Sequence, residues 1–415
     1  MEELLLTEGQ QRAKEAFCGF LTNPKARIMV LSGYAGTGKS TLVNHLLEEL
    51  PATLKMANLI NQEDIDWEVK LTATTNKAAE ALAAITQQEV KTIQSTLGLR
   101  VFKNYKTREN ELKPHGGAET LRHCILFIDE ASYVDSILQH WITELTEHCK
   151  IIFIGDPAQL TPPKTSTAPV FSKGYKTAAL TEVVRQAEGN PIIELATSFR
   201  NTVASGEFFA FTPDGDAIRH LDRVDYDQMI VDDFSRPDYE NNDAKVLAWT
   251  NKTVIRYNHG IREAVQGNPE LQVGDYAVCN QFIQNTSCKI RTDQEVMITH
   301  IAAGVDRGVK GWYVQMNYTN VAFLPADRVE ANAVKLLAHK DQDQDEGLYL
   351  DTHWIDLRAA YACTINKAQG STYKNVYIDL DDIASCHSGN QVARMMYVAV
   401  SRASERVILT GDLFK

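Results

Sequence analysis

Residues 28–50 read IMVLS-GYAGTGKS-TLVNHLLEEL and give the strongest indication of the fold. Residues 28–32 form a short apolar run typical of a strand, and residues 41–50 carry apolar side chains at helical spacing. Residues 33–40 between them match the glycine loop G-x-x-x-x-G-K-[ST]. A strand, a glycine loop and a helix in this order predict an α/β fold that cradles a nucleotide phosphate.

The glycines of this loop allow backbone N–H groups to turn inward around phosphates, and the following helix N-terminus adds partial positive charge. We expect Lys39 to reach the β- and γ-phosphates and the Ser40 hydroxyl to ligate Mg²⁺. ATP and Mg²⁺ are therefore the expected cofactors. The candidate nucleotide-binding residues of this segment are Gly33, Gly36, Thr37, Gly38, Lys39, Ser40 and Thr41.

A second apolar strand, residues 125–128, ends in Asp129 and Glu130. Behind a phosphate loop, Asp129 is expected to hold Mg²⁺, and Glu130 to orient or deprotonate the attacking water. A third strand, residues 151–154, runs into GDPAQLTPP, where the amide of Gln159 can bond the γ-phosphate or its water. Taken alone, this last segment reads as a turn with a surface glutamine.

Length and composition limit the number of domains and the class of partner. A chain of 415 residues exceeds the roughly 250–300 residues of a single core, which predicts at least two domains. The net charge of −12 excludes a broad basic coat, but it is compatible with a short nucleic-acid groove built from amides and hydroxyls. No apolar run reaches the ~18–20 residues of a membrane span, so no membrane partner is expected.

The N-terminus begins with acids and reads as an amphipathic helix, which argues against a signal peptide. The seven cysteines are scattered without a C-x-x-C pair, which favours reduced thiols over zinc ligands or disulfides. We expect a cytoplasmic protein of a bacterial or phage-infected cell.

Nearly the whole chain resembles the superfamily 1 helicases. Leu6–Gln10 is similar to the element whose glutamine reads adenine in that family, which implies this role for Gln10. The order and spacing of the motifs match superfamily 1B, the branch of RecD-like and phage Dda-like enzymes. Eight segments of this chain resemble the family's motifs I, Ia, Ib, II, III, IV, V and VI. In that order, the segments are Gly33–Ser40, Leu71–Ala79, Thr92–Ser95, Asp129–Ser132, Gly155–Pro163, Leu180–Gln186, Ala362–Thr372 and Tyr397–Ala403.

The resemblance implies an ATP-dependent DNA helicase that moves 5′ to 3′ on single-stranded DNA and separates the duplex ahead of it. It implies an α/β fold of two RecA-like P-loop motor domains with an inserted β-hairpin and an inserted SH3-like β-barrel. The expected domains are 1A (1–186, with the hairpin at about 98–118), 2A (187–269 and 351–415) and 2B (270–350). Short alternating apolar runs between 270 and 350 favour the barrel independently.

Two arginines, Arg185 and Arg402, are candidates for fingers that reach the γ-phosphate; an ordinary surface arginine is the alternative at each position. Gln369 and Gly370 of motif V are expected to contact the nucleotide. Asn366 stands where the family usually has histidine, so it receives no role.

Hydroxyls and amides of motifs Ia, Ib and V are expected to hold strand phosphates without reading bases. Local turns and helix caps are the alternative use of such side chains. The candidates are Thr74, Thr75, Asn76, Gln94, Ser95, Thr364 and Lys367. In the expected hairpin, Phe102 or Tyr105 would stack on the first base pair or, equally, pack the hairpin onto its domain.

The expected partners are single-stranded DNA and single-strand/duplex junctions, with a single-strand-binding or replisome protein in replication, recombination or repair. We expect a monomer. Three other functions remain open on the residues alone: an RNA or RNA–DNA helicase, a nucleic-acid-stimulated ATPase that remodels a protein partner, and a motor subunit of a larger nuclease complex.

Overall fold

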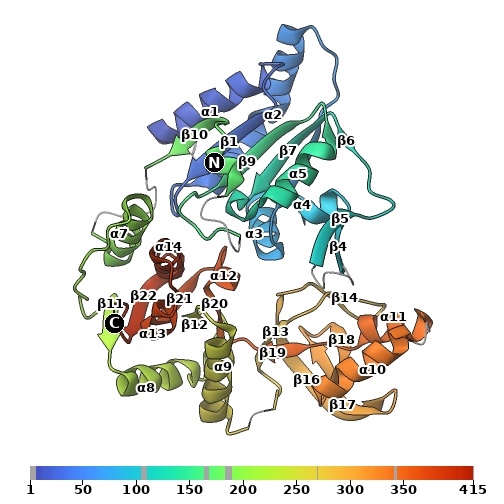
Figure 1. The fold of residues 1–415 in the computed structure, drawn as a ribbon, viewed down its shortest axis with the longest axis vertical. Coiled ribbons are helices and arrows are strands. Elements are labelled where there is room, and N and C mark those ends of the chain that lie inside the picture. The colour runs from blue at the N-terminus through green and yellow to red at the C-terminus, as the bar shows by residue number, and fades with distance from the viewer. Residues whose placement is uncertain are drawn as a thin grey trace. The chain divides into compact units, whose positions relative to one another are not determined.

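The computed structural model describes residues 6–103, 110–162, 168–182, 189–268, 270–340 and 344–414. The chain forms two compact units. The first unit comprises Met1–Phe211 and Ser388–Ser401, and the second comprises Thr212–His387 and Arg402–Lys415. Each unit is built around a sheet of parallel strands (Figure 1).

The parallel sheet of the first unit contains the strand that precedes the glycine loop. Its order is β10-β1-β9-β7-β2-β3, and every neighbouring pair is parallel. The strands are β10 (Lys176–Leu180), β1 (Ile28–Gly33), β9 (Lys150–Gly155), β7 (Cys124–Asp129), β2 (Glu68–Ala73) and β3 (Val90–Thr92). The three strands predicted at 28–32, 125–128 and 151–154 are confirmed as β1, β7 and β9.

Helices cover both faces of this sheet, because alternate side chains of each strand point to opposite sides. Ile125 and Phe127 of β7 pack with residues of α1, α2 and α3, whereas Leu126 and Ile128 pack with residues of α4 and α5. The helices of this unit are α1 (Glu8–Leu21), α2 (Lys39–Asn61), α3 (Asn76–Thr86), α4 (Ile93–Thr96), η1 (Ala131–Tyr133), α5 (Ser136–Glu144), α6 (Pro169–Ser172), α7 (Pro191–Ser205) and α14 (Gly389–Val400).

Two small ribbons complete the first unit. Strands β4 (Leu99–Lys103) and β5 (Asn110–Pro114) pair antiparallel, and β6 (Leu121–Arg122) pairs with β8 (Thr146–Glu147) in parallel. The β4–β5 pair lies where the sequence predicts the inserted hairpin. Residues 104–109, which include Tyr105, lie outside the described residues.

The second unit contains a parallel sheet of order β11-β22-β21-β12-β20. Aromatic and aliphatic side chains of α8 and α9 pack on one face of it. The elements are β11 (Ile218–Leu221), β22 (Ala403–Thr410), β21 (Tyr373–Asp379), β12 (Ala244–Ala248), β20 (Ala362–Thr364), α8 (Arg223–Phe234), α9 (Asn251–Gln266), α12 (Ile365–Ala368) and α13 (Leu380–Ala384).

The same unit also contains an antiparallel sheet of order β18-β17-β16-β13-β19. It falls mostly in the segment whose alternating apolar runs predict short strands. Its strands are β13 (Tyr276–Cys279), β16 (Glu295–Asp306), β17 (Val309–Met316), β18 (Asn320–Pro325) and β19 (Leu357–Ala359). The segment also contains a separate antiparallel pair, β14 (Ile283–Gln284) and β15 (Lys289–Ile290), and the helices α10 (Arg328–Lys340) and α11 (Gln344–His353).

The compact units are bounded differently from the predicted motor domains, whose limits stay a prediction. Helix α14 groups with the first unit, although its sequence neighbours β21 and β22 belong to the second. It does so because it packs against α7, which also groups with the first unit. Within the described residues, no helix combines the length and apolar character needed to cross a membrane.

Candidate nucleotide-binding site

The glycine loop joins β1 to α2 and requires glycine at several positions. Gly36 and Gly38 have φ of 81° and 74°, in the left-handed region that glycine adopts without strain. A Cβ at Gly33 would lie 2.7 Å from the Thr37 hydroxyl oxygen, so this position is also closed to larger residues. The loop conformation therefore depends on the glycines that the motif specifies.

Lys39, the first residue of α2, folds back over the loop. Its Nζ donates to the carbonyl oxygens of Gly33 (2.6 Å) and Tyr34 (2.9 Å). Ser40 and Thr41 follow it in the first turn of α2. This arrangement places the ammonium group beside the loop backbone, where it fits the phosphates of a nucleotide.

Gln10 is buried beside the same loop. Its Nε2 donates to the carbonyl of Thr37 (3.4 Å), and its Oε1 accepts from the Thr7 N–H (3.0 Å) as half of the capping box of α1. The capping box fixes the start of α1 against the loop. The predicted adenine-reading role of Gln10 stays a prediction.

Two acidic residues lie at the end of β7, Asp129 as its last residue and Glu130 directly after it. Asp129 accepts a hydrogen bond from the Glu130 N–H (2.8 Å), and Glu130 has a left-handed backbone with φ of 52°. Burial, reinforced by the negative charge of Glu130, raises the pKa of Asp129 to about 7, and the positive charge of Lys39 opposes this shift. A carboxyl group held in this way gains a balancing charge from a divalent cation, so the site fits Mg²⁺.

The loop after β9 carries Asp156 and Gln159, both buried. Asp156 accepts from the Ala158 N–H (2.9 Å), and burial raises its pKa while Lys39 opposes the shift. Lys39 thus lies near both Asp129 and Asp156. The structure brings the phosphate loop, the acidic pair and the Gln159 loop together at the carboxyl edge of one sheet, where ligands bind in α/β folds.

Side chains that sequence reasoning did not select also reach this edge. The Tyr397 hydroxyl from α14 donates to Asp156 and accepts from the Ala35 N–H (2.9 Å). Arg394 of the same helix donates to the carbonyls of Pro157 (2.7 Å) and Gln159 (2.6 Å). The Arg200 guanidinium of α7 lies 4.0 Å from the centre of the Tyr34 ring.

The residues of the first unit that are predicted to contact single-stranded DNA lie near the ends of β2 and β3. The Thr74 hydroxyl donates to the Glu130 carbonyl (3.0 Å), and Thr75 caps α3 by accepting from the Ala78 N–H. Gln94 donates to the Thr74 carbonyl (3.4 Å), which ties it to the same corner. Asn76 begins α3 and Ser95 lies in α4. The helix-cap alternative therefore describes Thr75, and the strand-binding roles stay predictions.

The predicted motif V and VI residues of the second unit gather around one loop. Gln369 is buried, Gly370 has φ of 81°, and the Arg402 guanidinium donates to the adjoining Ser371 carbonyl (3.1 Å). Thr364 caps α12 by accepting from the Lys367 N–H.

Lys367 pairs with Asp293 (2.7 Å), between β15 and β16. Asn366 lies in α12. Phe102 of β4 is exposed. Arg185 lies outside the described residues.

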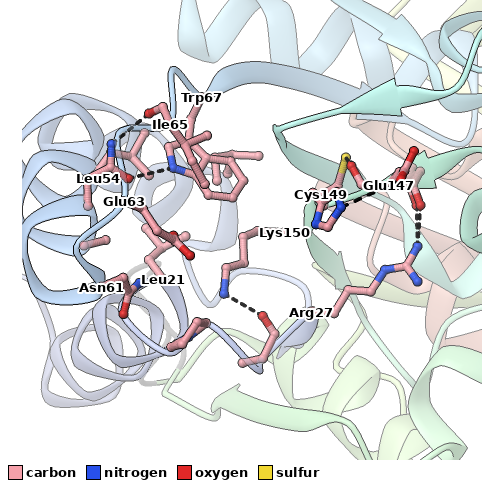
Figure 2. A pocket seen from close by; sticks show the side chains of 17 residues that line it. Leu21, Arg27, Leu54, Asn61, Glu63, Ile65, Trp67, Glu147, Cys149 and Lys150 are labelled. Atoms are coloured by element: carbon pink, nitrogen blue, oxygen red, sulfur yellow. Dashed lines mark hydrogen bonds and ion pairs between the residues drawn. The ribbon is translucent and has the colours of Figure 1, made fainter.

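A cavity of about 370 Å³ lies at the other edge of the first sheet (Figure 2). It is lined by residues near the start of two strands, Ile125 of β7 and Lys150 of β9, together with Trp67 and Glu63. The Lys150 ammonium donates to the carbonyls of Asn23 (2.6 Å) and Ala26 (2.7 Å). The N–H groups of Lys150 therefore stabilise the fold. The cavity lies at the amino edge of the sheet, separate from the nucleotide loops at the carboxyl ends of the strands.

The phosphate loop, its lysine and an acidic pair on a parallel sheet define a P-loop nucleotide-binding protein. Residues 5–223 match the family model "AAA domain", and residues 359–410 match "UvrD-like helicase C-terminal domain".

The chain is 31% identical to the ATP-dependent DNA helicase dda of Enterobacteria phage T4, covering 96% of this chain and 97% of that protein. It is 24% identical to the ATP-dependent RecD2 DNA helicase of Deinococcus radiodurans, over 93% of this chain and 47% of that protein.

A crystal structure of the Pif1 helicase from Candida albicans matches with a TM-score of 0.54 and 17% sequence identity. The match covers 99% of this chain and 95% of that chain, which supports the α/β fold with parallel sheets. The chain belongs to the superfamily 1B helicases, enzymes that couple ATP hydrolysis to DNA unwinding. The expected family is confirmed.

Proposed function

We propose that this chain moves 5′ to 3′ along single-stranded DNA and opens the duplex ahead of it, using ATP held at the glycine loop. The observation that carries the proposal is the assembly of Lys39, the Asp129–Glu130 pair and the Gln159 loop at one sheet edge, in a chain that aligns over nearly its whole length with a DNA helicase.

Each residue of this edge has a chemical task. Lys39 and the loop N–H groups bind the phosphates, and Ser40 and Asp129 would hold Mg²⁺, which supplies charge neutralisation when bound. Glu130 orients the attacking water and accepts its proton. Gln159 bonds the γ-phosphate or that water, so its loop responds when the phosphate leaves.

Arg185 and Arg402 act as fingers on the γ-phosphate. Such a finger stabilises charge on the transferring phosphoryl group and contributes on the order of 10³–10⁵ in rate. The hydroxyls and amides of Thr74, Thr75, Asn76, Gln94 and Ser95 form one strand grip, and Thr364 and Lys367 form the other. Two grips whose affinities alternate with nucleotide state are sufficient for directional movement.

The β4–β5 ribbon serves as the pin that the duplex strikes, and exposed Phe102 supports this role because it is available to stack on a base pair. The antiparallel sheet of the second unit is the SH3-like insertion of the family. Its Asp293, paired with Lys367, links this insertion to the second grip.

Single-stranded DNA and junctions are the proposed substrates. A solved structure that concerns the unwinding of forked double-stranded DNA by two coordinating Pif1 helicases has a TM-score of 0.54 to this chain. A single-strand-binding or replisome protein is the proposed partner class.

Unwinding of short duplexes with a 5′ or a 3′ single-stranded tail tests the proposal. The 5′-tailed DNA should open, and the 3′-tailed DNA should not. Glu130→Gln should still bind nucleotide and yet open neither. Opening from the 3′ tail would contradict the direction, and hydrolysis without opening would favour an ATPase that remodels a partner. Faster opening of a tailed RNA duplex would assign RNA as the substrate.

A further inference from the structure

The Tyr397 hydroxyl is the centre of a buried contact between α14, the glycine loop and the Asp156 loop. It uses both of its hydrogen-bonding functions, since it donates to Asp156 Oδ2 and accepts from the Ala35 N–H. Tyr397 is 2% exposed and Asp156 is 0% exposed. In a site with so little water, neither bond is readily replaced by solvent.

Arg394, one helical turn earlier, makes a second contact with the same loop. Its Nη1 donates to the carbonyls of Pro157 and Gln159, and its Nε donates to Asn390. The two carbonyls flank Ala158, whose N–H donates to the other oxygen of Asp156. The backbone on both sides of Ala158, including that of Gln159, is therefore held by α14.

These contacts are costly to leave incomplete. Arg394 is 5% exposed and Asp156 is 0% exposed, so burial has already removed most of their hydration. Without these hydrogen bonds, that loss of hydration would be uncompensated. Burial lowers the pKa of Arg394, and the charge of Asp156 opposes that shift. A change in the position of the Gln159 loop must therefore move α14 as well, or break several buried hydrogen bonds.

We propose that Tyr397 and Arg394 are positioning residues that make the glycine loop, the Gln159 loop and α14 move as one body. The inference rests on the proposed function, because it gives the γ-phosphate response of Gln159 a mechanical output. That output passes along α14, which ends at Val400, two residues before Arg402. Loss of the contact should uncouple hydrolysis from movement without weakening ATP binding.

Tyr397→Phe is the first test, with Tyr377→Phe as the matched control. The Tyr377 hydroxyl of β21 donates to Asp233 (2.7 Å), so the control also breaks a tyrosine–aspartate bond, one that is partly buried in the second unit. Tyr397→Phe should lower the DNA-stimulated kcat about tenfold, since small displacements at a reacting centre are costly. The KM for ATP should stay within about twofold because Lys39 and Ser40 are unchanged.

The number of base pairs opened per ATP should fall in Tyr397→Phe and stay unchanged in Tyr377→Phe. Arg394→Lys, which can still donate to one carbonyl, should fall between the wild type and Arg394→Met in both kcat and coupling. This second series keeps the test decisive if Tyr397→Phe does not fold.

Equal losses of thermal stability in the two tyrosine variants, with wild-type kcat and coupling in both, would overturn the inference. So would wild-type coupling in Arg394→Met. Failure of the proposed function looks different, because the wild-type chain would then hydrolyse ATP and open no duplex. In that case, kcat still decides whether Tyr397 positions the hydrolytic site.

Discussion

The two parallel sheets of this chain differ at their carboxyl edges. In the first, β1 leads through a glycine loop into α2, and Lys39 lies over the loop where we propose that the phosphate binds. In the second, β12 leads through Trp249 and Thr250 into α9, and the backbone N–H groups of both residues donate to Asp382. The anion that a helix N-terminus favours is supplied in the second sheet by the protein itself.

The amino edges of the two sheets are alike. Lys150 in β9 and Lys245 in β12 are both buried lysines near the start of a strand. Lys150 donates to carbonyls of the segment before β1, and Lys245 donates to the Ala360 carbonyl (2.6 Å) and the Asn241 side chain. We infer that the amino edges of the two sheets contribute stability, whereas nucleotide chemistry depends on the glycine loop at the carboxyl edge of the first sheet.

The largest expected difference is in the rate of ATP hydrolysis between substitutions of two lysines near helix starts, Lys39 of α2 and Lys252 of α9. Lys39→Ala removes the cation from the glycine loop and should lower ATP hydrolysis by at least about a hundredfold. Lys252→Ala, at the exposed start of α9, should leave hydrolysis within about twofold. Steady-state hydrolysis with saturating single-stranded DNA measures both, and equal losses would remove the distinction between the edges.

Removing the internal anion should destabilise the second unit. Asp382 also accepts hydrogen bonds from the hydroxyls of Thr250 (2.7 Å) and Thr253 (2.7 Å). Asp382→Ala removes the acceptor of these two hydroxyls and of the two N–H groups, which should lower the free energy of unfolding by about 2–3 kcal/mol. Chemical denaturation should show the loss, with Asp382→Asn intermediate. An unchanged unfolding free energy would mean that the carboxylate is not needed to close this turn.

Substitution of the buried lysines should cost less. Lys150→Met or Lys245→Met keeps the apolar stem but leaves backbone carbonyls without their donor, for a loss of about 1–2 kcal/mol in each case. Hydrolysis per folded molecule should match the wild type in both variants. A kcat defect in either one would show that the amino edges contribute more than stability.

The smallest effect concerns strand binding at the carboxyl edge of the second sheet. Asp293→Asn frees Lys367 from its ion pair, so single-stranded DNA should bind about two- to threefold more tightly, as expected for a partly exposed pair. Lys367→Ala should reduce the slope of log affinity against log salt by about one. Fluorescence anisotropy across a salt series measures both. An unchanged slope would place Lys367 away from the strand.

The sequence predicts the parts of the fold that local patterns encode. The glycine loop with its strand, and the acidic pair at the end of β7, are found within a residue or so of their predicted bounds, because spacing along the chain specifies them. The helix predicted at 41–50 is also found, but it continues to Asn61. Side chains joined across long separations give no such signal. Tyr397 and Asp156 are 241 residues apart, and Thr250 and Asp382 are 132 apart.

Some residue types are ambiguous because one side chain can serve two purposes. Thr75 and Thr364 match the family's strand-binding motifs, yet both hydroxyls accept the cap hydrogen bond of a helix. Gln10 likewise belongs to a capping box as well as to the loop. The pattern that predicts a binding role is the same pattern that starts a helix, so sequence alone does not separate them.

The assignment of α14 to the first unit has a consequence for protein synthesis. Residues 1–211 leave the ribosome early in synthesis. The helix that completes the first unit lies in residues 388–401, which are translated after nearly all of the second unit. Until then, the Asp156 loop lacks Tyr397 and Arg394. A product cut short before residue 388 contains the whole glycine loop and the Asp156 loop, yet it lacks the helix that contacts both loops. We therefore expect an unfinished chain to hydrolyse ATP more slowly than the complete chain, for the same reason as Tyr397→Phe.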